Sequence, residues 1–568
     1  MRSKLKNSII FCFDLFLSVY FVFILGLFVT NYSFIFKSSV SNLSNQAVIF
    51  LFCLFIRWGV DKKSFNNSIL VRWLRYLAKI NDNTKLILVA ASLFLILLFI
   101  GIMRHLAFSS AGIDMGVTDQ AIWNTLNGRI LFSSLDGKIN HLGSHFEPVL
   151  FLITPFYLVL PDIIVLIFLQ ALALGAAIWP LYLIAKLRLN NKLLVFAFIF
   201  AYFLSRPLRG VGLLDFHTDA FLIPLSFFSY YFLITKRNFW AIITIFLMLC
   251  CKETAAILIF AYGIFAITFL KRYRFGSGLL VLAITWWILV TNFIMPYFAH
   301  TETYPYSKWL PFGVTYSDNI LALIKDPMLI IKLLFSWEKL AFYSKLFMPL
   351  GMFSFFSPQH YILFLLPLMT QIIGSVNHGG MVTITGHYPA HTLPFIFISA
   401  IYGVANLVDF FKNKPLLGRY KLKAVSICFG VIIILFSLFF YGKGDGHKLS
   451  KFMQSADNLK SAKIKQALRS IPQEASVSAI HRIVPHLTHR KFIYIWESNI
   501  ATRYLVEYVV LHRQLIEVGK DDFDGSLSQL KEKGFKEIYS DEDRNLYILY
   551  NSLNKRELLE QLPSKFIL

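Results

Sequence analysis

Long runs of apolar residues, separated by short polar segments, fill the first 441 positions of the chain. A helix needs about 20 apolar residues to cross the hydrocarbon core of a bilayer. The pattern therefore predicts a polytopic α-helical membrane protein. It predicts about 13 spans, near residues 9–29, 45–58, 86–103, 163–185, 191–205, 218–235, 238–250, 254–270, 278–297, 339–357, 360–376, 388–411 and 422–441.

The connections between these runs alternate in charge. One set is basic and nearly free of acids, and the other is longer and carries acidic, histidine and aromatic residues. Cytoplasmic loops carry the excess of Lys and Arg, so the basic set predicts a cytoplasmic N-terminus. Because 13 is odd, the segment after the last span is predicted to be extracytoplasmic. The basic connections are residues 1–6, 57–85, 186–192, 236–237, 271–274 and 412–423.

From about residue 442 helical and strand patterns alternate, which is typical of a small α/β domain. Helices are expected at 455–470, 526–534 and 554–562, and strands at 475–480, 491–496, 503–511 and within 536–550. The predicted organisation is an extra N-terminal transmembrane hairpin with a cytoplasmic linker (1–84), a transmembrane catalytic domain (85–441) and a soluble extracytoplasmic domain (442–568).

The composition supports a membrane protein and argues against a nucleic-acid-binding protein. Hydrophobic residues make up 57% of the 568 residues and charged residues only 15%, against about 25% charged in soluble domains. The formal net charge is +23, but the excess falls mostly in short loops, so a nucleic-acid partner is not expected. The five cysteines lie in or beside apolar runs, which indicates neither a disulfide framework nor a Cys-based zinc site.

Ionisable residues near membrane depth are costly and are therefore functional candidates. Four clusters of them fall on the predicted outer side, and together they predict a cavity for an anionic, lipid-borne substrate. They are Asp114, Asp119, His141, His145 and Glu147 in the first outer loop; Arg206, Arg209, Asp215, His217 and Asp219; the pair Lys252 and Glu253; and His378, His387, Tyr388 and His391.

Each cluster also has a structural interpretation. The two arginines could bind an anionic phosphate or pair with Asp215 or Asp219. Lys252 and Glu253 could neutralise each other, although a buried charge pair is costly unless a ligand uses it. Histidines at one membrane face favour a cavity lining, and a divalent metal site stays open as an alternative.

The motifs DxGxxDQxxWN (from Asp114), HFEPxLxLxxPxY (from His145), FHTDA, KE and HYPA resemble a widespread bacterial and archaeal family of multispanning membrane proteins of unknown function. That family is similar to the GT-C glycosyltransferases, which take a sugar from a polyprenyl-phosphate donor at the outer face. The resemblance implies a catalytic acidic residue at Asp114, a later acidic motif at Asp215 or Asp219, and a donor-phosphate contact at Lys252. The acidic pair of the first GT-C loop is usually adjacent, whereas Met115 follows Asp114 here, so Asp119 stays an alternative base.

The predicted function is transfer of a sugar from a polyprenyl-phosphate donor to a lipid, glycan or protein acceptor, with inversion. An aspartate would act as general base, and Lys252 with Arg206 or Arg209 would neutralise the leaving phosphate. The remaining candidates would bind substrate, and no cofactor is required, although a divalent metal would be compatible. The predicted location is the cytoplasmic (inner) membrane. The alternatives are a lipid-linked saccharide flippase or transporter and a non-catalytic scaffold.

Overall fold

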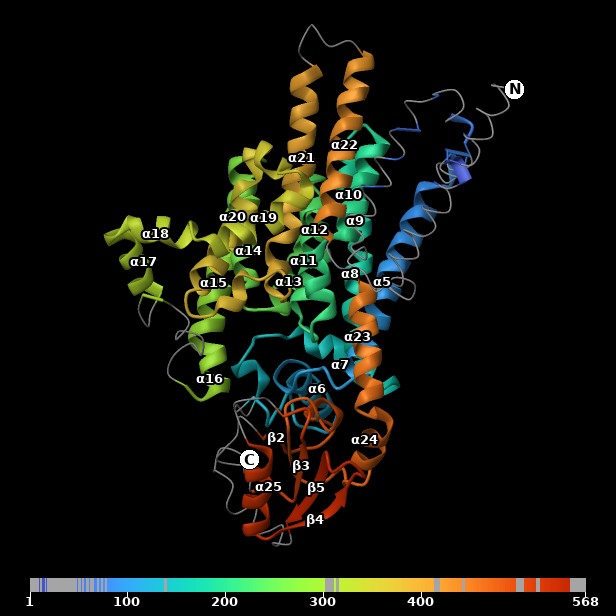
Figure 1. The fold of residues 1–568 in the computed structure, drawn as a ribbon. Coiled ribbons are helices and arrows are strands. Elements are labelled where there is room, and N and C mark those ends of the chain that lie inside the picture. The colour runs from blue at the N-terminus through green and yellow to red at the C-terminus, as the bar shows by residue number, and fades with distance from the viewer. Residues whose placement is uncertain are drawn as a thin grey trace, which may run out of the picture.

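The computed structural model describes residues 79–551 except 137–139, 302–310, 313–315, 413–418, 442–444, 497–504 and 517–521, together with isolated residues before 79. A bundle of helices occupies the first part of this range, and a small mixed sheet follows it at one end of the bundle (Figure 1). The predicted spans at 9–29 and 45–58 and the predicted helix at 554–562 lie largely or wholly outside the described residues.

The apolar runs form most helices of the bundle, many of them within a few residues of the predicted bounds, whereas the helices at 206–213, 316–325 and 327–334 lie between predicted spans. The helices of the bundle are α5 (Asp82–Leu106), α8 (Ile164–Ala176), α9 (Ile178–Arg188), α10 (Lys192–Leu204), α11 (Arg206–Leu213), α12 (Asp219–Ile234), α13 (Asn238–Cys251), α14 (Ala255–Thr268), α15 (Tyr273–Leu289), α16 (Met295–Ala299), α17 (Tyr316–Lys325), α18 (Pro327–Leu334), α19 (Trp337–Phe347), α20 (Tyr361–Gly374), α21 (Leu393–Lys412) and α22 (Arg419–Tyr441).

Five helical stretches of the described chain are long and apolar enough to cross a membrane, and a sixth is added if α10 and α11, bent by 43°, count as one span. Several other apolar helices are shorter, including α12, α13 and α14 with 16, 14 and 14 residues. The chain is thus a multi-pass membrane protein. The total of 13 spans stays a prediction.

The bundle packs closely where small residues meet. A Cβ added at Gly263 on α14 would lie 2.6 Å from a methyl carbon of Leu280 on α15, and one at Gly276 would lie 2.8 Å from the Gly263 carbonyl oxygen. Small residues at such positions let two helix backbones approach each other closely. The van der Waals contacts formed in this way hold membrane helices together, because the hydrophobic effect does not drive helices together within lipid.

The connection after α5 contains two short helices, α6 (Val117–Leu126) and α7 (Val149–Val159). In the sequence, the alternating polar and apolar faces of 118–126 predict a helix that lies in the membrane interface, and the apolar segment 148–160 is too short to cross the membrane. The placement of α6 differs from the prediction, because the helix is largely buried between the bundle and the sheet (Figure 1).

The C-terminal unit contains a five-stranded sheet in the order β2-β1-β3-β5-β4. The strands β1 (Val477–Ala479), β2 (Ile493–Ile495) and β3 (Tyr508–His512) are parallel, and β5 (Leu546–Asn551) runs antiparallel to β3 and β4 (Phe535–Ser540). The helices of this region are α23 (Asp445–Asn458), α24 (Ser461–Leu468) and α25 (Phe523–Glu532). The predicted small α/β unit is confirmed, with the helix expected at 455–470 divided near Lys460, whose φ is 51°.

The first loop of the bundle contributes to the core of this C-terminal unit. Phe108, Val117, Phe132 and Leu135 pack in one apolar cluster with residues of the sheet. On α6, the Gln120 side-chain amide also donates to the carbonyl oxygens of residues 490 and 491, each at 3.1 Å. The C-terminal unit therefore lies directly over the loop that carries the first candidate cluster.

Candidate functional site

Asp114 lies in a π-helical turn, Gly112–Gly116, immediately before α6. Its carboxylate is 39% exposed, and its one ion pair among the described residues is with His217 Nε2 at 3.7 Å, which is too long for a hydrogen bond. The other ring nitrogen of His217 lies 2.9 Å from the Asp215 carbonyl oxygen. A carbonyl can only accept, so Nδ1 carries a proton, and in the neutral ring the Nε2 lone pair faces Asp114.

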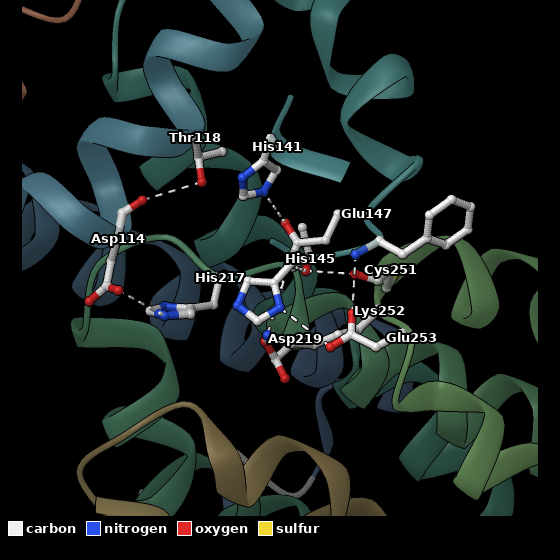
Figure 2. A network of polar contacts seen from close by, with 12 residues as sticks. Asp114, Thr118, His141, His145, Glu147, His217, Asp219, Cys251, Lys252 and Glu253 are labelled. Carbon is white, nitrogen blue, oxygen red and sulfur yellow. Dashed lines mark hydrogen bonds and ion pairs between the residues drawn. The ribbon is translucent and has the colours of Figure 1, made fainter. Parts of the chain in front are cut away.

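Lys252 is the centre of the buried cluster in Figure 2. It follows α13 in the turn to α14, where the sequence predicted a break in the apolar run. Its Nζ donates to Asp219 Oδ2 at 2.8 Å and lies 3.8 Å from Glu147 Oε1. The Glu147 carboxylate also accepts from Thr218 Oγ1 at 2.9 Å. One ammonium group therefore joins carboxylates from two of the predicted clusters.

His141 lies between two carboxylates. Its Nδ1 is 3.3 Å from Asp136 Oδ2, and its Nε2 is 3.2 Å from Glu147 Oε2. Burial lowers the pKa of this imidazole, but the hydrogen bonds with Asp136 and Glu147 outweigh it and raise the pKa to about 10. Burial likewise raises the pKa of Glu147, whereas its bond to His141 and the charge of Lys252 lower it to about 2. His141 is therefore an imidazolium at neutral pH.

Glu253 fixes the segment that precedes α7. Its carboxylate accepts from the backbone N–H of Phe146 at 3.1 Å and lies 3.3 Å from His145 Nδ1. Glu253 is 1% exposed, whereas the His145 side chain is 30% exposed. His145 is thus held by a buried carboxylate and still faces open space.

Residues 387–391, the HYPAH segment that precedes α21, complete the site. The ring of His387 stacks on that of His217, with centroids 3.9 Å apart, and His391 Nε2 lies 2.7 Å from Asp219 Oδ1. The Tyr388 ring contacts His387 at 4.0 Å and His378 at 5.8 Å between centroids. The ring contacts therefore run from His217 through His387 and Tyr388 to His378.

These groups surround a cavity of about 100 Å³. Most of its charged lining comes from the first three predicted clusters, and Thr118 and Asp136 of the first outer loop add to it. The HYPAH segment contacts this lining through the stacking of His387 on His217. Among the described residues, no three His, Cys, Asp or Glu side chains are arranged to hold a metal ion. The lining includes Asp114, Thr118, Asp136, His141, His145, Glu147, His217 and Lys252.

The structure places both arginines of the second cluster away from this lining. Arg209 is 4% exposed, donates to the Tyr441 carbonyl oxygen at 3.0 Å and lies 3.6 Å from the centroid of that ring. Arg206 is exposed at the first residue of α11. Since Arg209 anchors the end of α22, it does not reach a ligand in the cavity, contrary to the phosphate role predicted for it.

Two predicted carboxylates are engaged elsewhere. Asp215 makes a bidentate pair with Arg104, at 2.6 and 3.0 Å, and accepts from the backbone of residue 111. Asp119, the alternative base, is 1% exposed and lies 3.2 Å from His489 Nε2. It also accepts from Tyr157 at 2.7 Å and from Thr488. Asp119 is therefore fully occupied and does not line the cavity of Asp114.

Sequence reasoning gave no specific role to four participants. His141 was part of the first predicted cluster, and Asp136 lies in the same outer loop but was interpreted as a solvated loop charge. Arg104 was also visible, as a cation at the predicted outer end of a span. His489 gave no signal, because nothing in the pattern of the C-terminal unit points to contact with Asp119.

Two solved structures show what the chain is similar to. They are ArnT from Cupriavidus metallidurans bound to undecaprenyl phosphate, with 11% identity, a TM-score of 0.48 and coverage of 83% of this chain and 99% of that one, and the same protein in the apo state, with 11% identity, a TM-score of 0.43 and coverage of 83% and 98%. No curated protein sequence matches. The family model described as "Predicted membrane protein (DUF2079)" matches residues 104–543, and the chain belongs to that family.

Proposed function

We propose that the protein is a membrane-embedded glycosyltransferase of the GT-C type. It transfers a sugar from a polyprenyl-phosphate donor to an acceptor hydroxyl, with Asp114 as the general base. Two features support this function: the sequence motifs that resemble GT-C glycosyltransferases, and the charged side chains that line the cavity of Asp114. The acceptor is a lipid, a glycan or a protein.

The observation that carries the proposal is the contrast between Asp114 and the other carboxylates of the cavity. Asp136 and Glu147 are each held by His141, whereas the Asp114 carboxylate is 39% exposed and, within the part of the chain that the structure describes, contacts only His217, at 3.7 Å. A general base must reach the proton that it removes. Asp114 is the lining carboxylate that meets this requirement among the described residues.

In the proposed reaction the acceptor oxygen attacks the anomeric carbon while its proton passes to Asp114. The bond from that carbon to the phosphate oxygen breaks on the opposite face, so the anomeric configuration inverts. The transition state is oxocarbenium-like, as in glycoside hydrolysis. His217 is fixed by the hydrogen bond that its Nδ1 donates to the Asp215 carbonyl oxygen and would orient the acceptor.

Lys252 would stabilise the leaving phosphate. Its ammonium has three donors; one goes to Asp219, and the side chain lines the cavity. An ammonium already fixed by a buried carboxylate is preorganised, and such groups stabilise charge that develops in the transition state. His145 lies 3.3 Å from Glu253 and would contact the sugar from the other side.

The proposal places the cavity on the extracytoplasmic side of the inner membrane. It rests on the alternation of basic connections, which assigns the N-terminus to the cytoplasm and the C-terminal unit to the opposite side. Polyprenyl-phosphate sugars would then reach the cavity from the outer leaflet.

The test uses the full chain in liposomes with radiolabelled polyprenyl-phosphate sugars. Glycosyl transfer predicts loss of label from the carrier and, with an acceptor present, a product of inverted anomeric configuration. Movement of the intact donor across the bilayer without bond cleavage would instead identify a transporter. If the protein neither cleaves nor moves any donor in a panel of sugars, both activities are refuted and a scaffold role is favoured.

A further inference from the structure

A second cavity, of about 350 Å³, lies between the bundle and the C-terminal unit. It shares no lining residue with the cavity of Asp114. Its walls come from the end of α5, from Asp119 on α6, from the turn before α8, and from α24 and the segments 471–473 and 485–490 that follow it. Figure 1 shows α24 beside the sheet, near the end of the bundle where α7 lies.

This cavity contains a buried cation that makes no direct ion pair within the described residues, although the charges of Glu507 and Glu474 act on it from further away. Arg490 is 4% exposed, and its guanidinium donates to backbone carbonyl oxygens of Leu487, Pro472 and Ala475 at 2.7 to 3.1 Å. No carboxylate of the described chain lies within ion-pair distance of it. Burial lowers the pKa of Arg490 to about 10. An unpaired buried charge is costly, so it points to an anionic ligand.

Two further cations line the cavity from α24. Lys465 is half-buried and Arg469 is exposed, and neither side chain forms an ion pair within the described residues. The carboxylates of the lining oppose them only in part. Asp119 is already paired with His489, and Asp162 accepts from the backbone N–H of residue 164 at 2.9 Å. The lining therefore carries an excess of positive charge.

The position of the cavity indicates where the anion comes from. The lining residues His105 and Ile163 lie at the ends of two stretches long and apolar enough to span a membrane. Leu158, Val159 and Leu160, which directly precede the lining residues of the turn, are 72%, 88% and 49% exposed. An acyl chain would cover such an apolar surface, while its headgroup lies at the level of the cations.

We propose that this second cavity binds the phosphate group of a membrane lipid whose headgroup is a phosphate monoester. The lining carries three cations, Lys465, Arg469 and Arg490. Because Asp119 is paired with His489, Asp162 is the one other carboxylate of the lining that opposes them. The excess matches a phosphate monoester, which carries a charge of about −1.5 to −2 at pH 7, better than the single charge of a phosphodiester. The proposal does not depend on glycosyl transfer, because it concerns other residues and requires no sugar.

The test is isothermal titration of the full chain in detergent micelles with short-chain lipids of equal acyl length. The probes are dioctanoyl phosphatidic acid, dioctanoyl phosphatidylglycerol and inorganic phosphate. The expected order places phosphatidic acid about tenfold or more tighter than the other two, since only it combines the charge with the chains. Equal affinity for inorganic phosphate would refute the lipid source, and equal affinity for phosphatidylglycerol would refute the monoester.

A pair of matched double variants locates the site. Lys465→Gln with Arg469→Gln removes two cations that face the cavity, and should weaken phosphatidic acid binding by about 10–100-fold. Lys460→Gln with Lys463→Gln removes two cations near the start of the same helix that pair with Asp543 and Glu542 at the surface. This control should bind like the wild type. Equal binding by both double variants, or no binding by the wild type, would overturn the proposal.

Discussion

Replacing Lys252 by methionine removes the ammonium from the buried cluster and leaves its carboxylates in place. The Nζ lies 2.8 Å from Asp219 and 3.8 Å from Glu147. At an effective dielectric constant near 20 these pairs represent about 6 and 4 kcal/mol of gross attraction. Desolvation of the ammonium offsets much of this, and breaking a buried pair from one side costs about 3–5 kcal/mol. We expect the free energy of unfolding to fall by that amount.

Denaturant titration in mixed micelles, followed by tryptophan fluorescence, measures this loss. The double variant Lys252→Met with Asp219→Asn should be more stable than Lys252→Met alone, because it no longer buries the uncompensated Asp219 carboxylate. Lys192→Met is the matched control: it breaks an ion pair of 2.9 Å whose lysine is 82% exposed, and should unfold like the wild type. A Lys252→Met variant as stable as this control would refute the reasoning.

Two further predictions concern neighbouring groups. The raised pKa of His141 stabilises the fold fully below pH 6.5, and this contribution is lost as the pH rises through about 10. The lowered pKa of Glu147 stabilises it above pH 4.5 and is lost as the pH falls toward about 2. The melting temperature should therefore be highest between pH 4.5 and pH 6.5, where both contributions are fully present. His141→Gln should reduce the fall of the melting temperature at alkaline pH. Arg104→Met should cost about 3–5 kcal/mol in denaturant titration, since it strands the buried Asp215 carboxylate; an unchanged midpoint would contradict this.

The sequence predicted the helices well because apolar runs and charged breaks are local signals. The interruption at Lys252 divides one apolar run into α13 and α14, and the short run after Pro148 forms the short helix α7. The placement of α6 was not predictable in this way. Its burial depends on Gln120 meeting carbonyl groups about 370 residues away in the chain, and no periodicity encodes such a contact.

The candidate site was predicted as a set of residues more successfully than as a set of roles. Charge at membrane depth correctly marked Asp114, His217 and Lys252 as neighbours, because costly groups gather where they can pair. The same argument did not separate them from Arg209 and Asp215, which bind Tyr441 and Arg104 instead. Partner choice among charged groups depends on tertiary geometry, which the sequence pattern does not contain.

The most direct test of the central claim is the single-turnover rate of sugar transfer by Asp114→Asn, with a donor that the wild type cleaves. The amide keeps the size of the side chain but cannot accept the proton. The rate should fall by about 10²–10⁴-fold, while binding of the donor stays unchanged and the control Asp524→Asn, on the surface helix α25, transfers normally. An Asp114→Asn variant with the wild-type rate would contradict the account.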